Sequence, residues 1–339
     1  MAIYKPNQKR KWLPKTYNQG WLYCERINHI DNKKSLVDFL SSKYKHSSSE
    51  VWEKRLADGQ IKINYQTVND NQILHVQDLI HWNRPPWEEP GVPASWDVVF
   101  DNGDVLVINK PSGLPTTPGG GFLKHTLSAM LDLKYKKEND YSIPKPIHRL
   151  GRYTSGLILC ARKKKTRNAL CALFREQNKR EMFFQRIYRG LAISNSILNS
   201  SNSIKIESPI SKHSHPFLGE IWNTDNQQTQ MLNLKEIQNT KLSALTKIKL
   251  LERRESEDLL EISIHTGRPH QIRIHLASIG TPLIGDPLYI GNGKLSRNAL
   301  PGQGGYLLHS YQLINIPIDN KMYSFEAPLP KKLKRATHD

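Results

Sequence analysis

The strongest constraint on the fold is a short, continuous apolar run, GLILC, at residues 156–160. A strand with one solvated face alternates in polarity, whereas a continuous run of this length is typical of a strand covered on both faces. Directly before it stands HRLGRYTS, residues 148–155, where a histidine, two arginines, a threonine and a serine crowd together. The sequence therefore predicts a polar loop that emerges from a buried sheet, a position where sites are often built.

Strand patterns dominate the rest of the chain after residue 97. VVFDNGDVLVINK predicts a hairpin, because a DNGD turn separates two apolar runs. Two alternating strands are predicted on either side of the charged turn ERRESED. Helices are predicted in the basic segment after GLILC and from Pro269 to the stop at Gly280. Near the end of the chain, LLHSYQLINIP and SFEAPLP are expected to form two edge strands.

A smaller module precedes these strands at residues 34–82. SLVDFLSSKY and SSSEVWEKRLADG space their apolar residues as helices do, and the residues after Gly59 alternate as short strands. The pattern resembles the small RNA-binding fold of ribosomal protein S-four, whose helix, glycine and strand step is matched by LADGQIKIN; an unrelated α+β module is the alternative. Residues 83–97, rich in proline, are predicted to be an extended linker between this module and a large domain at 98–335. Residues 1–33 form a basic N-terminal segment.

The charge indicates a polyanionic partner. The 339 residues include 49 Lys and Arg against 31 Asp and Glu, a formal net charge of +18. An excess of this size favours nucleic acid over an anionic membrane. No window approaches the roughly 18 apolar residues of a membrane span, and MAIYKPNQKRKWLPKTY lacks the apolar core of a secretory signal. We therefore expect a cytoplasmic monomer that does not bind membranes.

Two basic clusters are candidates for phosphate contact. Residues 1–20 carry basic side chains and no acid, and an unbound, disordered tail is an equally open interpretation there. Residues 161–190 hold ten basic side chains against two glutamates, and among them are Lys163, Lys164 and Lys165. Because this second cluster directly follows the HRLGRYTS loop, we favour RNA binding over a merely solvated helix face.

Neither a metal site nor a disulfide is expected. Three cysteines are present: Cys24, Cys160 and Cys171. Their number is odd and no C-x-x-C spacing occurs, so they are interpreted as reduced structural thiols. His265, His270 and His275 are spaced five apart, and cannot share one helical face as zinc ligands at i and i+4 would.

Several ordered motifs resemble the RluA-type family of RNA pseudouridine synthases, over residues 98 to about 330. They are VINKPSGLPTTP, HRLGRYTSGLILCAR, RIYRGLA, HTGRPHQIRIHLASIGTPLIGDPLY, and LHSYQL with FEAPLP. The resemblance implies an α+β fold, with a mixed, mostly antiparallel β-sheet, flanking helices and an RNA-binding cleft. It also implies isomerisation of uridine to pseudouridine in ribosomal or transfer RNA by base flipping, without a cofactor and without DNA as a partner.

The resemblance further implies the site. The family's catalytic aspartate follows H-R-L, where this chain has Gly151; its tyrosine over the flipped base is matched by Tyr188, and its arginine that pairs with the aspartate by Arg268. The remaining matched or neighbouring polar residues are expected to contact RNA. They are His148, Arg149, Arg152, Thr154, Ser155, Lys163, Lys164, Lys165, His270, Gln271 and Arg273.

Gly151 places the chemistry in question, because glycine cannot attack a sugar carbon, take a proton or pair with Arg268. Three readings are open. Another carboxylate could serve, with candidates Asp101, Asp104 and Asp286, although each fits a turn. The chain could be an inactive paralogue that still binds RNA. Gly151 could also be required for a backbone with positive φ. We predict an active synthase, with an inactive RNA-binding protein as the alternative, and expect Gly151→Asp to distinguish them.

Overall fold

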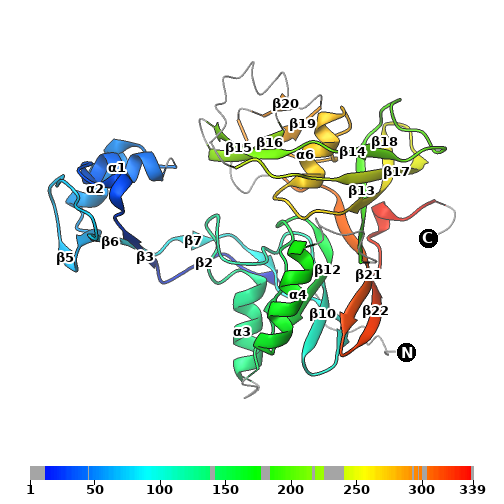
Figure 1. Ribbon diagram of the computed structural model, residues 1–339, viewed down its shortest axis with the longest axis horizontal. Helices are drawn as coiled ribbons and strands as arrows, with labels where there is room; N and C mark the ends of the chain where they lie inside the picture. Colours follow the sequence, from blue (N-terminus) through cyan, green and yellow to red (C-terminus); the bar gives the residue numbers. More distant parts are fainter. Residues whose placement is uncertain are drawn as a thin grey trace. The chain divides into compact units, whose positions relative to one another are not determined.

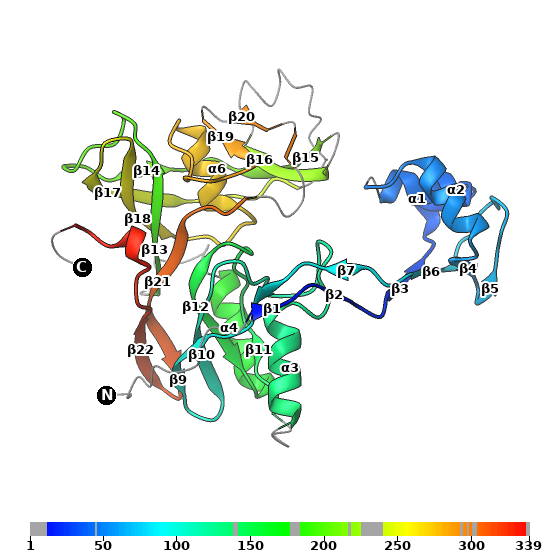
Figure 2. The same ribbon diagram turned by 180° about the vertical axis from the view of Figure 1, so that it is seen from behind.

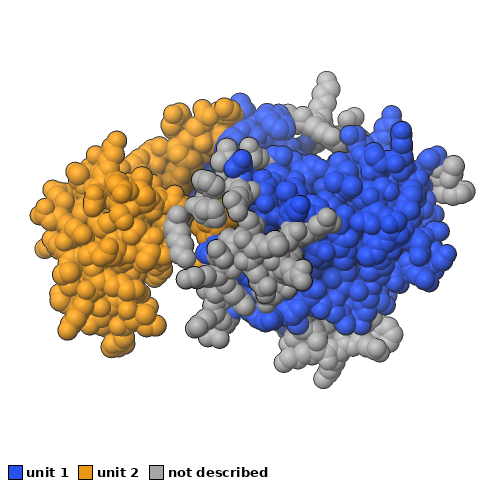
Figure 3. Space-filling model, turned by 90° about the horizontal axis from the view of Figure 1, so that it is seen from above, with its two compact units in different colours: residues 1–14, 90–214, 222–339 blue, residues 15–89, 215–221 orange. Residues whose placement is uncertain are grey.

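A computed structural model describes residues 12–44, 46–137, 142–176, 184–215, 218–224, 240–291, 294–296, 298–299 and 304–336. The chain divides into two compact units, drawn in blue and orange in Figure 3. The larger unit comprises Met1–Pro14, Pro90–Ser214 and Trp222–Asp339, and the smaller comprises Lys15–Glu89 and His215–Ile221. Among the described helices, none is long and apolar enough to cross a membrane.

A ten-stranded sheet forms the centre of the larger unit (Figure 1). Its main path runs in the order β14, β17, β18, β13, β21, β12, β10, β9, while β11 pairs with β12 and β22 with β21. The strands are β9 Asp97–Asp101, β10 Val105–Lys110, β11 Lys145–Pro146, β12 Ser155–Ala161, β13 Gln185–Ile193, β14 Ile204–Ile206, β17 Thr246–Arg253, β18 Glu257–Ile264, β21 Leu308–Ile318 and β22 Lys321–Glu326. Among the described strands of this sheet, β12 and β21 pair in parallel and the others pair antiparallel. The expected mixed, mostly antiparallel sheet is confirmed.

The GLILC run is buried on both faces, as its pattern predicts. Ile158 and Cys160 point into a core cluster with Leu127 and Leu131 of helix α3 (Leu127–Lys137). The alternate residues of β12 face a second cluster, to which helix α4 (Lys164–Glu176) contributes Leu170. The sequence pattern did not reveal α3. Helix α3 covers one face of β12, the strand that follows the HRLGRYTS loop.

The end of the chain departs from the sequence-based expectation. LLHSYQLINIP was expected at an edge, but β21 lies between β13 and β12 in the interior of the sheet (Figure 2). It pairs antiparallel with β13 and in parallel with β12. Pairing of this kind joins segments far apart in the chain, which the local alternation of residues does not encode. The prediction of an edge strand was therefore wrong.

Helix α6 spans Gln271–Ser278, two residues later than expected from Pro269. His270 precedes it with φ 56°, a left-handed conformation that a first helical turn does not allow. The predicted stop is confirmed, because Gly280 adopts φ 80° just past the helix. The turn at 268–270 therefore joins β18 to α6 and positions Arg268.

The smaller unit has the expected two helices and a small sheet. Its helices are α1 Leu36–Lys43 and α2 Ser49–Ala57, and its sheet runs in the order β3 Trp21–Arg26, β6 Leu79–Arg84, β4 Ile61–Ile63 and β5 Gln66–Thr67. The helices cover one face, where Trp52, Trp82 and Ile61 share a buried cluster. The relation to ribosomal protein S-four stays a prediction. So do the domain limits, although strand β3 comes from the segment 1–33.

Short strand pairs complete the structure. The proline-rich stretch carries β7 Glu88–Glu89 and β8 Val92–Pro93, which pair with β2 Thr16–Tyr17 and β1 Trp12–Leu13. Further pairs are formed by β15 Ile210–His215 with β16 Gly219–Thr224, and by β19 Tyr289–Ile290 with β20 Lys294–Leu295. Two 3-10 helices lie at His29–Asp31 and Lys331–Leu333. The predicted linker is thus partly ordered by backbone pairing.

Candidate active site

A buried lysine, Lys110, holds the loop before β12 by a hydrogen bond. Lys110 ends β10, and its Nζ donates to the carbonyl oxygens of Pro111, Leu114 and Arg152 at 2.9, 2.7 and 3.2 Å. Burial lowers the pKa of Lys110 to about 7. Because its three acceptors come from two loops, the Lys110 amine holds the HRLGRYTS loop against the residues after β10.

Gly151 stands at the exposed turn of that loop, where the Thr154 amide donates to its carbonyl oxygen at 3.1 Å. It is absent from the residues with positive φ, so the interpretation of a left-handed glycine was wrong. Steric crowding distinguishes the position instead. A Cβ atom placed on Gly151 would lie less than 3.0 Å from the Tyr306 hydroxyl oxygen. This glycine is required by a neighbouring side chain and not by its own backbone.

Tyr188 and Arg186 lie near the start of β13, and Arg268 lies near Arg186. Tyr188 is buried on β13, opposite Ser310 of β21, and shares a core cluster with Leu150 and Tyr306. Burial raises the pKa of the Tyr188 hydroxyl, so it stays neutral at ordinary pH. Arg186, on the same strand, is also buried, and burial together with the charge of nearby Arg268 lowers its pKa. Cationic and phenolic side chains therefore converge here.

Arg268 is fixed by hydrogen bonds from both its backbone and its guanidinium group. The Arg268 amide donates to Gln271 Oε1 at 3.1 Å, and Arg268 Nε donates to the Ser243 carbonyl oxygen at 2.9 Å. Burial lowers the pKa of its guanidinium. Within the described part of the chain, no carboxylate lies within ion-pair distance of Arg268. The arginine is therefore positioned without the acidic partner that the family resemblance implies.

The three candidate substitute acids are all engaged elsewhere. Asp101 accepts two hydrogen bonds from Arg162 at 2.8 and 2.9 Å. Asp104 accepts from the Lys163 amide and the Thr166 hydroxyl at 2.9 and 2.6 Å, and so caps α4.

Asp286 is likewise occupied by an ion pair. It accepts two hydrogen bonds from Arg273, at 2.6 and 2.7 Å, and its carboxylate is almost fully buried. None of the three carboxylates is free to take the role of an aspartate at position 151.

Comparisons with known proteins identify the family. The model of the family described as RNA pseudouridylate synthase matches residues 104–278. An uncharacterized RNA pseudouridine synthase of Synechocystis is 37% identical over 88% of this chain and 95% of its own length. The chain belongs to the RNA pseudouridylate synthase family. It is an isomerase of the RluA type.

Two further matches extend the comparison. Ribosomal large subunit pseudouridine synthase D of Buchnera aphidicola is 29% identical, over 91% of this chain and 97% of its own length. The solved structure of human RNA pseudouridylate synthase domain containing 1 superposes with a TM-score of 0.51 at 22% identity, covering 73% of this chain and 89% of the human chain. The second match supports the fold alone.

In this pseudouridine synthase, the residues expected to contact RNA fall into two sets. Five of them are exposed: Arg149, Lys163, Lys164, Lys165 and also His270, which in addition forms a hydrogen bond within the protein. Arg152 and Ser155 are half-buried; Arg152 Nε donates to the Gly113 carbonyl oxygen at 3.1 Å, and the Ser155 hydroxyl meets His309 Nδ1 at 2.8 Å. The exposed set can reach phosphate groups directly.

The second set is engaged within the protein. His148 stacks on Phe174 with ring centroids 4.6 Å apart and accepts from the Leu159 amide, and burial with the charge of Arg186 lowers the pKa of His148 to about 3. His270 Nδ1 meets the Tyr289 hydroxyl at 3.0 Å. The buried residues of this set are Thr154, Gln271 and Arg273.

Gln271 shows how this second set supports the site. Its Oε1 accepts from the Thr266 hydroxyl and the Arg268 amide, and its Nε2 donates to the Leu245 carbonyl and Thr246 hydroxyl oxygens. All four hydrogen-bonding positions of the amide are thus used inside the protein. Gln271 positions Arg268, and direct contact with RNA would require it to give up these bonds.

Three residues of the site were not singled out from the sequence: Lys110, Arg186 and Tyr306. Lys110 and Arg186 were included only as members of longer motifs, and Arg186 was also counted within a basic cluster. The sequence carried one usable signal for Tyr306, which is the glycine pair directly before it, GGYLLHS. Paired glycines allow close backbone approach, and Gly305 packs against the ring of Tyr153.

Proposed function

We propose that this enzyme isomerises uridine to pseudouridine in ribosomal RNA, without a cofactor, after flipping the target base out of its stack. The observation that carries this proposal is the convergence of Tyr188, Arg186 and Arg268 beside the HRLGRYTS loop. The aromatic ring of Tyr188 is suited to stacking on a flipped uracil, and the guanidinium group of Arg268, fixed by hydrogen bonds, favours the phosphate groups that flank it. Unstacking costs a few kcal/mol, which such contacts must supply.

Ribosomal RNA is proposed because the name of a relative of similar length refers to the ribosomal large subunit, and transfer RNA is the second candidate. The exposed cluster Lys163–Lys165 at the start of α4 supports a structured RNA, because lysines at a helix edge can follow a phosphate backbone. A cytoplasmic location and a monomeric state are part of this proposal.

The first test is release of tritium from RNA labelled at carbon five of uridine. Ribosomal and transfer RNA fractions from a strain lacking this gene serve as separate substrates. We expect release from one fraction by the wild-type protein, and a loss of at least about 100-fold on Arg268→Ala, because a positioned cation in a desolvated site is removed. Arg26→Ala, an exposed arginine on β3, is the matched control. Equal rates for Arg268→Ala and wild type would contradict the assigned site.

The engagement of Asp101, Asp104 and Asp286 by other residues favours one alternative, an RNA-binding protein without isomerase activity. That alternative predicts tight binding of RNA and no tritium release from either fraction. The two functions are therefore separated by one assay, provided that affinity is measured in parallel.

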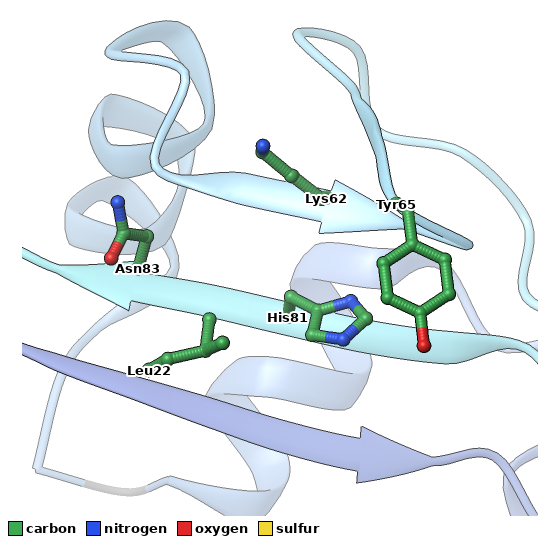
Figure 4. A pocket seen from close by; sticks show the side chains of 5 residues that line it. All are labelled: Leu22, Lys62, Tyr65, His81 and Asn83. Atoms are coloured by element: carbon green, nitrogen blue, oxygen red, sulfur yellow. The ribbon is translucent and has the colours of Figure 1, made fainter.

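A pocket on the smaller unit supports RNA binding by that unit (Figure 4). It lies on the sheet face and is lined by Leu22, Lys62, Tyr65, His81 and Asn83. Tyr65 is 73% exposed, and its ring centroid lies 4.7 Å from that of His81. His81 is only 6% exposed, and its Nδ1 makes no hydrogen bond within the described part of the chain. An exposed aromatic ring, a lysine and an amide are suited to an unpaired base and its phosphate.

We expect Tyr65→Ala to weaken binding of the substrate RNA by about tenfold, because stacking of one base is lost. Tyr17→Ala is the control, since Tyr17 is 71% exposed in the same unit but does not line the pocket. Filter binding at constant salt measures both affinities. An equal effect of the two substitutions would contradict a base-binding pocket.

A further inference from the structure

The space that a side chain at position 151 needs is occupied by a hydroxyl group from another segment. Beyond the clash with Tyr306 Oη, a Cβ atom on Gly151 would lie 3.4 Å from Thr154 Oγ1 and 3.6 Å from Tyr306 Cζ. The last two separations are ordinary or nearly ordinary contacts. Only the hydroxyl oxygen of Tyr306 therefore excludes a side chain at position 151.

Tyr306 is held too firmly to move aside. Its residue is 5% exposed, and the Arg273 guanidinium lies 4.5 Å from its ring centroid. Tyr153 packs edge-on against the same ring at 6.0 Å and 74°. Arg273 is itself fixed by its two hydrogen bonds to Asp286. Displacing the hydroxyl would thus disturb a buried ion pair and an aromatic contact together.

The hydroxyl oxygen of Tyr306 lies beside the Cβ position of Gly151, which is an exposed residue. Thr154 Oγ1 donates to Tyr306 Oη at 3.4 Å. A phenol has one proton to donate besides its acceptor positions, and this bond uses only an acceptor position. The remaining proton can reach a group that approaches over Gly151, which is exposed.

We propose that the Tyr306 hydroxyl replaces the family's aspartate as the polar group that contacts the target nucleotide, and that Gly151 is required to make room for it. This inference rests on the proposed isomerase activity. It also accounts for Arg268, which has no carboxylate partner in the described part of the chain. A hydroxyl group does not need such an ion pair, so the arginine is kept while its acidic partner is replaced.

Gly151→Asp by itself does not test whether an acid restores the chemistry. Introduced alone, the aspartate meets the Tyr306 hydroxyl, so a loss of activity or stability would report a clash and not the chemistry of the acid. Substitutions that separate space from chemistry are therefore needed. Removing one oxygen in Tyr306→Phe leaves the ring in place and frees the position of a Cβ at residue 151, because Cζ lies at 3.6 Å.

The experiment measures tritium release, RNA affinity and thermal stability of the full chain. Tyr306→Phe is expected to lower release at least about 100-fold while affinity stays within about threefold. The matched control is Tyr135→Phe, a buried tyrosine of the same core cluster whose ring also faces an arginine, Arg162, at 5.1 Å. That control is expected to retain release within about threefold.

A second comparison tests the shared space. Gly151→Ala is expected to lower the melting temperature by roughly 4 °C or more in the wild-type background, and by much less in the Tyr306→Phe background. Equal shifts in both backgrounds would overturn the steric claim. If Tyr306→Phe releases tritium as fast as the wild type, the role of the hydroxyl is overturned while the proposed function stays intact. No release by the wild type from any RNA would overturn both.

Discussion

Asp286→Asn is expected to lower the free energy of unfolding by about 3–5 kcal/mol. The substitution leaves the Arg273 guanidinium buried without a counter charge, since its two side-chain hydrogen bonds run to Asp286 at 2.6 and 2.7 Å. Asp286 also accepts from the amides of Leu288 and Tyr289 at 3.0 and 3.1 Å, and so holds the turn after α6. Because Arg273 stacks on Tyr306, loss of this pair should also disturb the hydroxyl at Gly151.

Urea unfolding followed by far-ultraviolet circular dichroism measures this effect in the full chain. The matched control is Asp132→Asn, which breaks an exposed ion pair with Lys145 and should cost less than about 1 kcal/mol. A cost for Asp286→Asn no larger than that of the control would show that the buried pair does not hold this part of the fold.

Gly156→Ala is expected to cost about 4 kcal/mol or more, or to prevent recovery of folded protein. Gly156 has φ 102°, and a Cβ atom there would lie 2.7 Å from the Ser310 nitrogen and 2.8 Å from the Ser310 carbonyl carbon. Backbone atoms cannot yield as a side chain can, so β12 and β21 would separate at their parallel contact. That contact joins the HRLGRYTS loop to the strand that faces Tyr188.

Gly103→Ala provides the control for backbone strain. Gly103 also has a positive φ, 87°, but nothing lies within 4 Å of its Cβ position. It should therefore cost only the roughly 1–2 kcal/mol of a left-handed residue. Thermal unfolding of the two variants separates strain from close approach, and similar melting temperatures for both would argue against the tight contact of β12 with β21.

Local patterns predicted much of the fold. The hairpin of β9 and β10, the hairpin of β17 and β18 and helices α1, α2 and α4 all lie where periodicity and turn chemistry indicated. The pairing of β21 between β13 and β12 could not be predicted in this way, because it depends on contacts between residues more than a hundred positions apart. Strand alternation records which face is buried, but not which strand lies alongside.

Some residues of the candidate site could be identified from the sequence, and others only from the structure. Residues that belong to a motif, such as Gly151, Tyr188 and Arg268, were identified from the sequence. The partners that decide what these residues can do were not, because Lys110 lies at the end of β10 and Tyr306 in the segment before β21. Burial also separated residues that looked alike in the sequence: Arg149 is exposed, whereas Arg273 is locked to Asp286.

The sequence by itself determined the family, the α+β class and the loss of the aspartate, since each is written in residue identities and their order. The reason for a glycine at position 151 is visible only in the tertiary structure. A hydroxyl 155 positions further along the chain fills the space of its missing side chain. Steric exclusion of this kind acts through distance in space, and no local pattern of residues records it.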